Sequence, residues 1–221
     1  MSLPRVNLVV VGHKDHGKST LIGRLLYDSK AILSKKVEEI KDELERSGRK
    51  FEFAHILDSL EEERKGGLTI DIVQTPFRSK KYLYTIIDCP GHREFIKKML
   101  TGASQADAAV LVLSASEGIQ DQTKQHAFLV RKLGITQFVV ALNKMDAVAY
   151  DEDVFRRLCR DLRANVLHPL GLSKAPVIPV SALEGDNVFS ASEKMRWYDG
   201  LAFIDALDAC IVPSTRAVDR P

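Results

Sequence analysis

The chain has 221 residues, and its 45% hydrophobic side chains can form the core of one large domain or two small ones. Its 32 lysines and arginines nearly balance 30 aspartates and glutamates, so a net charge of +2 gives little attraction to nucleic acid or an anionic membrane. The three cysteines are far apart, which argues against a disulfide framework or a zinc site and favours a reducing compartment such as the cytoplasm.

Short apolar runs typical of buried strands recur along the chain and alternate with amphipathic helical patterns. The expected strands cover residues 6–11, 70–77, 82–87, 108–113, 138–142 and 177–180, and clear helical stripes cover 93–101 and 153–167. Strands that alternate with helices usually form a parallel sheet covered on both faces. The sequence therefore predicts an α/β fold with a doubly wound, mostly parallel sheet.

A long interval separates the first expected helix from the second expected strand. Residues 34–46 are strongly charged and are expected to form a solvated helix, while 51–68 mix apolar residues with the run EEERK. Connections of this length are usually functional or mobile. The tail 211–221 contains two prolines and no apolar period, so the expected division is one domain over 1–210 followed by a linker.

Neither a membrane partner nor direct nucleic-acid binding is expected for this domain. No apolar run approaches the roughly 20 residues of a membrane span, and the first four residues lack a signal-peptide core. The balanced charge offers no basic footprint for nucleic acid.

The stretch GHKDHGKST, residues 12–20, follows an apolar strand and precedes the helical pattern TLIGRLLYD. A Gly-x-x-x-x-Gly-Lys-Ser loop in this context presents backbone N–H groups to phosphate. Lys18 can reach the outer phosphates, and the Ser19 hydroxyl can bind Mg²⁺. His13 and His16 are expected to pack against neighbouring strands rather than to bind a metal. The candidate phosphate-binding residues here are His13, Lys14, Asp15, His16, Gly17, Lys18, Ser19 and Thr20.

The motif DCPGH follows the expected strand 82–87. An acidic residue at the carboxyl end of a parallel strand lies at the ligand-binding edge of the sheet, so Asp88 can hold Mg²⁺. Gly91 allows its amide to approach a terminal phosphate closely. His92 follows on a turn that could move when that phosphate leaves.

Two further motifs point to guanine. In NKMD, Asp146 can accept hydrogen bonds from the N1–H and 2-amino groups of guanine, which adenine does not present in that arrangement. Asn143 can contact the base edge or tie back to the phosphate loop, and Lys144 can lay its stem over the base. The tripeptide of Ser181, Ala182 and Leu183 follows another strand and would offer backbone N–H groups to the guanine oxygen.

The motifs and their order resemble the translational GTPase superfamily, and specifically the branch of elongation factor Tu and elongation factor 1-alpha. The resemblance rests on GHKDHGKST, GLTI, DCPGH, TGASQADAAVLV, QTKQHAFLVRKLGI, NKMD and SALEGDNV. It implies a P-loop NTPase G domain that hydrolyses GTP to GDP with Mg²⁺. By this likeness Thr69 joins Ser19 and Asp88 as a metal ligand, His92 is the catalytic residue that orients water, and Asp15 helps to hold a monovalent cation such as K⁺.

The resemblance also implies partners and further domains. Full-length members carry β-barrel domains after the GTPase domain, deliver aminoacyl-tRNA to the ribosome and use a nucleotide exchange factor. A second resemblance, through STLIGRLLYDSKAIL and YDEDVF, is to the GTPase subunit of sulfate adenylyltransferase, although that family usually has an acidic residue at the place of His16. A slow nucleotide switch with a non-translational partner, whose output is the order of residues 29–69, is the non-enzyme alternative.

Two departures from the family pattern bear on hydrolysis. Gly66 replaces an arginine in the family's segment before Thr69, which removes a charge and loosens the backbone. Lys14 replaces a valine that usually screens the catalytic histidine, so only Leu68 remains of that apolar screen. The ammonium of Lys14 either extends into solvent or stabilises the terminal phosphate in cis.

Overall fold

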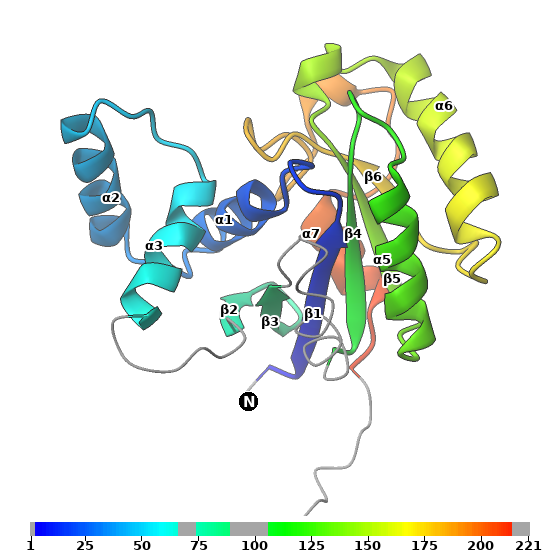
Figure 1. The fold of residues 1–221 in the computed structure, drawn as a ribbon, viewed down its shortest axis with the longest axis horizontal. Helices are drawn as coiled ribbons and strands as arrows, with labels where there is room; N and C mark the ends of the chain where they lie inside the picture. The colour runs from blue at the N-terminus through cyan, green and yellow to red at the C-terminus, as the bar shows by residue number, and fades with distance from the viewer. Residues whose placement is uncertain (1–2, 66–73, 89–105, 214–221) are drawn as a thin grey trace, which may run out of the picture.

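The computed structural model describes residues 3–65, 74–88 and 106–213, and these form a six-stranded sheet with helices on both faces (Figure 1). The strands lie in the order β2-β3-β1-β4-β5-β6. The bounds of the strands are β1 Arg5–Gly12, β2 Gln74–Arg78, β3 Leu83–Asp88, β4 Ala108–Ser114, β5 Phe138–Asn143 and β6 Val177–Pro179. Only the β2–β3 pair of this sheet is antiparallel, which confirms the predicted doubly wound, mostly parallel sheet.

The central strands are apolar throughout because both of their faces are covered. In β1, Leu8 and Val10 face one hydrophobic cluster while Val9 and Val11 face the other. Alternate residues of a strand point to opposite faces, so a strand buried on both sides needs a continuous apolar run. This is why the runs at 6–11, 108–113 and 138–142 were recognisable as strands.

The described helices divide between the two faces of the sheet. Buried residues of α1, α2, α3 and α7 join the first cluster, and those of α5 and α6 join the second. Their bounds are α1 Lys18–Asp28, α2 Ser34–Arg46, α3 Ala54–Lys65, α5 Asp121–Lys132, α6 Glu152–Leu162 and α7 Phe203–Cys210. Figure 1 shows α2 and α3 on the outer side of α1, away from α5 and α6.

The long interval after α1 is a helical insertion. Helix α2 is not fully solvated as expected, because Val37, Ile40 and Leu44 lie on one stripe and are buried. In α3, Ile56 and Leu57 are buried in the same cluster. Apolar residues three and four positions apart share one face of a helix, so even a strongly charged segment can dock through a narrow stripe.

Three expected segments differ from the structure or lie outside its described part. The strand expected at 70–77 is seen as β2 from Gln74 onward, since residues 66–73 are outside the described ranges, as is the expected helix 93–101. The helix expected at 153–167 is α6, whose N-cap Asp151 accepts a hydrogen bond from the Val154 amide at 2.9 Å, followed by a π-helical turn over Arg163–Leu167. Within the described ranges, no helix has the length and apolar character to cross a membrane.

The described packing extends past residue 210, where the sequence places the end of the domain. Ile211 is buried in the first cluster, and the Val212 amide donates a hydrogen bond to Gln137 Oε1 at 2.7 Å. The described packing thus continues two residues beyond α7. The division into a domain and a linker stays a prediction.

Candidate functional site

The phosphate loop lies where β1 ends and α1 begins. Gly12 is paired with Val112 of β4, and Gly17, with φ 84°, caps the N-terminus of α1. A Cβ atom at Gly17 would lie 2.3 Å from Asn143 Nδ2, so only glycine fits this conformation and this close approach. The first amides of α1 and the loop together form the kind of site that favours anions.

Two buried histidines fix the position of the loop through hydrogen bonds to backbone carbonyls. His16 is fully buried, and its Nδ1–H donates to the Val112 carbonyl at 3.4 Å. Burial lowers the pKa of His16 to about 4, so the ring is neutral at pH 7 and its 3.7 Å approach to Glu117 is not an ion pair. His126 of α5 donates from Nδ1 to the Gly12 carbonyl at 3.1 Å, and burial lowers its pKa as well. His16 therefore packs as the sequence predicts.

The other residues of the loop are more accessible. His13 is half-buried with its ring edge-on to His16, at 5.0 Å between centroids, while Lys14 and Asp15 are exposed. The Lys14 amide donates to Gln122 Oε1 at 3.2 Å, so α5 anchors this part of the loop. Lys18 Nζ donates to the His13 carbonyl at 2.8 Å, which places its ammonium along the loop. Ser19 and Thr20 occupy the first turn of α1.

Asn143 joins the phosphate loop to one of the segments expected to bind guanine. Its side chain is buried at the end of β5; Nδ2 donates to the His16 carbonyl at 3.0 Å, and Oδ1 accepts from the Ala182 amide at 2.9 Å. The tie back to the phosphate loop, one of the two expected roles of Asn143, is thus present. One amide side chain thus joins His16, 127 residues before it, to Ala182, 39 residues after it.

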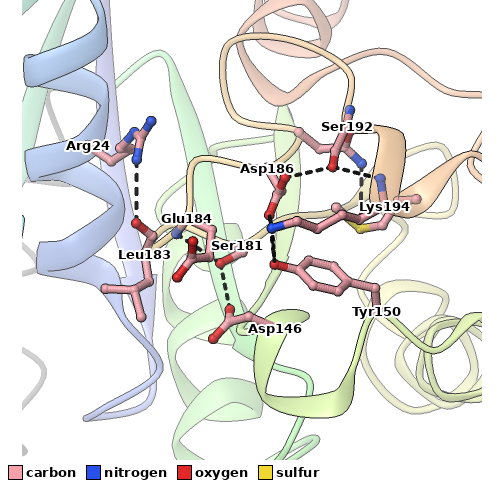
Figure 2. A network of polar contacts seen from close by, with 11 residues as sticks. Arg24, Asp146, Tyr150, Ser181, Leu183, Glu184, Asp186, Ser192 and Lys194 are labelled. Atoms are coloured by element: carbon pink, nitrogen blue, oxygen red, sulfur yellow. Dashed lines mark hydrogen bonds and ion pairs between the residues drawn. The ribbon is translucent and has the colours of Figure 1, made fainter.

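The two expected guanine-binding segments also contact each other. Ser181 Oγ donates to Asp146 Oδ1 at 2.6 Å, as Figure 2 shows. Lys144 has a φ of 63°, and its Nζ forms an ion pair with Glu117 at 3.2 Å. Leu183, which follows Ala182 in the sequence, is half exposed. The Asp146 carboxylate is therefore held next to the loop that carries Ala182 and Leu183.

The remaining predicted site residues are only partly described. Asp88 ends β3, where its backbone is in register with Val10 of β1 and so lies close to the phosphate loop. Thr69, Gly91 and His92 lie outside the described residues. Their assignments as metal ligand, phosphate-binding residue and catalytic residue stay predictions.

A further polar network adjoins the two base-binding segments and was missed from the sequence. It comprises Tyr150, Asp186, Ser192 and Lys194 (Figure 2). Asp186 lies in the segment SALEGDNV, but nothing in the sequence relates it to Tyr150, Ser192 and Lys194, whose irregular spacing is typical of ordinary surface composition. Only the fold shows that they lie together.

The family described as Elongation factor Tu GTP binding domain matches residues 3–213. Elongation factor 1-alpha of Thermococcus kodakarensis is 50% identical over 218 residues, covering 99% of this chain and 50% of the relative. The corresponding protein of Methanosarcina barkeri is 49% identical over 213 residues, covering 95% of this chain and 50% of the relative. The chain thus spans about half the length of the curated relatives it matches.

Solved structures give the same result. The sup35 structure complexed with GMPPNP superposes with a TM-score of 0.67 at 28% identity, covering 94% of this chain and 45% of that one. A bacterial selenocysteine-specific elongation factor gives a TM-score of 0.60 at 28% identity over 95% of this chain and 28% of that one. These relatives favour the translation-factor branch over the sulfate-activating one. The chain belongs to the family of elongation factor Tu GTP-binding domains, the G domains of translational GTPases.

Proposed function

We propose that this domain binds and hydrolyses GTP in a cytoplasmic elongation factor that delivers aminoacyl-tRNA to the ribosome and is recharged by a nucleotide exchange factor. The observation that carries the proposal is the double tie of Asn143, which brings the phosphate loop and the Ser181–Leu183 segment to one site. The high identity to elongation factors 1-alpha supports the pathway.

The phosphates are proposed to lie against the loop amides and the N-terminus of α1. Lys18 already lies along this loop and carries the positive charge that contacts the outer phosphates. Gly91 would add its amide at the terminal phosphate. His16 is buried and neutral, so its ring adds no positive charge to the phosphate loop.

A magnesium ion is proposed to bind where β1 and β3 end, beside the first turn of α1. Ser19 and Thr69 offer hydroxyl oxygens and Asp88 a carboxylate, and Mg²⁺ prefers such hard oxygen donors. Ser19 is the second residue of α1, and Asp88 is the last residue of β3, the strand that pairs with β1. When bound, the ion would neutralise charge on the phosphates. Asp15 is proposed to help hold a monovalent cation such as K⁺.

The base is proposed to be read by Asp146. Its carboxylate accepts from guanine N1–H and the 2-amino group, while Lys144 covers the ring. The Ser181 and Ala182 amides, also expected to face the guanine oxygen, already donate to the Asp186 carbonyl and to Asn143 Oδ1, so the Leu183 amide takes this role. The Ser181 hydroxyl takes one lone pair of Asp146 and leaves the others for the base. The carboxylate is therefore oriented before the nucleotide arrives.

Asp146→Asn tests this reading of the base. An amide replaces one acceptor by a donor, so GDP binding should weaken by at least about 1–3 kcal/mol, roughly 5- to 150-fold. Xanthosine diphosphate, which has a carbonyl where guanine has the 2-amino group, should bind more tightly to the variant than to the wild type. Equilibrium titration with fluorescent nucleotides measures both effects.

Asp153→Asn is the matched control, because Asp153 is an exposed carboxylate on α6 close to Asp146 in sequence. It should leave both affinities unchanged. Unaltered GDP affinity in Asp146→Asn would remove Asp146 from the site.

A further inference from the structure

Asp186 is the centre of a cluster of hydrogen bonds beside the base-binding segments. Its Oδ2 accepts from the Tyr150 hydroxyl at 2.7 Å and from Lys194 Nζ at 3.0 Å, and its Oδ1 accepts from Ser192 Oγ at 2.7 Å (Figure 2). Burial alone would raise the pKa of Asp186, but these three donors outweigh it and lower the pKa. The carboxylate is therefore charged at neutral pH and fixed on both oxygens.

These contacts close a ring that passes through Asp146. The Asp186 carbonyl accepts from the Ser181 amide at 3.1 Å, and Ser181 Oγ donates to Asp146 Oδ1 at 2.6 Å. From Asp146 the chain continues through the 3-10 helix Asp146–Val148 to Tyr150, whose hydroxyl returns to Asp186. A ring closed by hydrogen bonds restricts each member more than an open chain of contacts does.

The turn that leads to Tyr150 needs such support. Ala149 and Tyr150 have φ of 53° and 58°, in the left-handed region that non-glycine residues rarely adopt. The Tyr150 amide donates to the Met145 carbonyl at 2.8 Å, and Trp197 Nε1 donates to the Tyr150 carbonyl at 3.0 Å. Lys194 also covers the Tyr150 ring at 4.9 Å. The conformation directly after Asp146 thus depends on where the Tyr150 side chain is held.

We infer that Asp186 and Tyr150 are positioning residues for guanine specificity. They act on Asp146 through Ser181 on one side and through the Asp146–Tyr150 turn on the other. Together they hold the Asp146 carboxylate in the orientation that meets the 2-amino group of guanine. This inference rests on the proposed function, in which Asp146 reads the base. The two residues make no contact with the nucleotide themselves in this scheme. Their effect is on selectivity, because a misdirected carboxylate loses its two parallel hydrogen bonds first.

The test compares GDP with inosine diphosphate, which lacks only the 2-amino group. In the wild-type chain, GDP should bind about 10- to 100-fold more tightly than inosine diphosphate, as expected for a hydrogen bond to a charged group. Asp186→Asn should reduce this ratio at least about fivefold, and Tyr150→Phe, which removes one hydroxyl, about two- to threefold. A merely structural role would weaken both nucleotides equally and leave the ratio unchanged.

Asp205→Asn is the matched control, because Asp205 also accepts from a lysine, Lys80, at 3.2 Å but lies on α7. It should keep the wild-type ratio. Thermal unfolding of each variant shows whether it is folded, and if Asp186→Asn is not, the Tyr150→Phe ratio decides. A wild-type ratio in the folded variants overturns the inference, while the separate response of Asp146→Asn to xanthosine diphosphate shows whether the proposed function itself fails.

Discussion

At the scale of single residues, the fold selects the protonation state of His16. The ring is fully buried, its Nδ1–H is used by the Val112 carbonyl, and its Nε2 has no hydrogen-bond partner within the described structure. The Val112 hydrogen bond and Glu117 favour a positive charge there, while His13 and Lys18 oppose it by smaller amounts. Burial is the largest effect, so His16 resists protonation until the pH is well below its ordinary pKa.

This suppressed ionisation predicts a pH-dependent stability. The pKa of His16 falls from 6.5 to about 4 on folding, so between these values the unfolded chain binds a proton that the folded chain does not. The contribution of neutral His16 to the free energy of unfolding is complete above pH 6.5. It decreases as the pH falls toward 4, and below pH 4 it no longer changes with pH. It should amount to about 2–3 kcal/mol across this window. Urea unfolding at several pH values measures it.

His16→Gln isolates the effect, because glutamine does not titrate. The variant should lose about 2–3 kcal/mol less than the wild type between pH 7 and pH 4, whatever its stability at pH 7. His126, whose pKa is also lowered, contributes equally to both proteins and cancels in the difference. Parallel curves for the two proteins would mean that His16 is protonated in the folded state near its ordinary pKa.

Residues in short, ordered motifs were predictable, and residues that act through the fold were not. Gly17, Lys18, Asn143 and Asp146 occupy fixed positions after apolar strands, so spacing alone indicated a nucleotide site. Asp186 lies in the segment SALEGDNV, but the resemblance assigned it no role. Its importance depends on Tyr150, 36 positions away, and no periodicity in the chain encodes that contact.

At the scale of elements, Arg24 connects the α2–α3 insertion with the loop Ser181–Leu183, which is proposed to bind the base. Its guanidinium lies 4.7 Å from the Phe53 ring centroid, and Nη1 donates to the Leu183 carbonyl at 3.4 Å (Figure 2). An ion pair to Asp28 at 2.8 Å fixes the side chain along α1. A Cβ atom at Gly185 would lie 2.1 Å from Arg24 Nη2, so this approach requires glycine at the turn, where φ is 85°.

Arg24→Ala should therefore loosen the insertion before it loosens the sheet. Loss of the cation–π contact and of the packed stem should lower the local stability of α3 by about 1 kcal/mol, a five- to sixfold increase in amide exchange. Hydrogen exchange followed by mass spectrometry measures α3 against β4 as the internal reference. Arg156→Ala removes a similar i,i+4 ion pair, with Glu152, from α6 and should leave α3 unchanged. Equal exchange of α3 in both variants would contradict the role of Arg24.

Element boundaries were predictable where one physical signal dominates. The apolar strands β1, β4 and β5 appear within a residue or two of the expected ranges because burial on both faces demands continuous apolar runs. The turn after α6 was not predictable, because Leu158, Leu162 and Val166 keep helical spacing through it. The π-helical bond from the His168 amide to the Arg163 carbonyl leaves no trace in the apolar pattern.

At the scale of the whole molecule, sheet order explains why distant motifs share a site. Strands β1, β4, β5 and β6 are parallel neighbours, so the segments after β1, β5 and β6 emerge at one edge. Their order along the chain could be predicted from the sequence. The direct hydrogen bonds of Asn143 to the His16 carbonyl and of Ser181 to Asp146 could not be predicted, because they depend on how the segments pack in the folded chain.

Hydrolysis is proposed to depend on His92 as well as on this preformed site. Because orienting a water molecule matters mainly in the transition state, His92→Ala should leave GDP affinity within about twofold and slow single-turnover GTP hydrolysis about 100-fold. The rates are measured with and without ribosomes, since a translation factor is expected to need its activator.

His168→Ala is the control, because His168 is an exposed histidine at the end of the π-helical turn after α6, and the variant should retain wild-type rates. Equal rates for His92→Ala and the wild type, each with ribosomes, would exclude His92 as the catalytic residue. A wild-type chain that binds GTP but shows no hydrolysis under either condition would favour a slow nucleotide switch. The affinity measurements separate these outcomes, because the proposed contacts of Asn143, Asp146 and Lys18 with the nucleotide do not depend on hydrolysis.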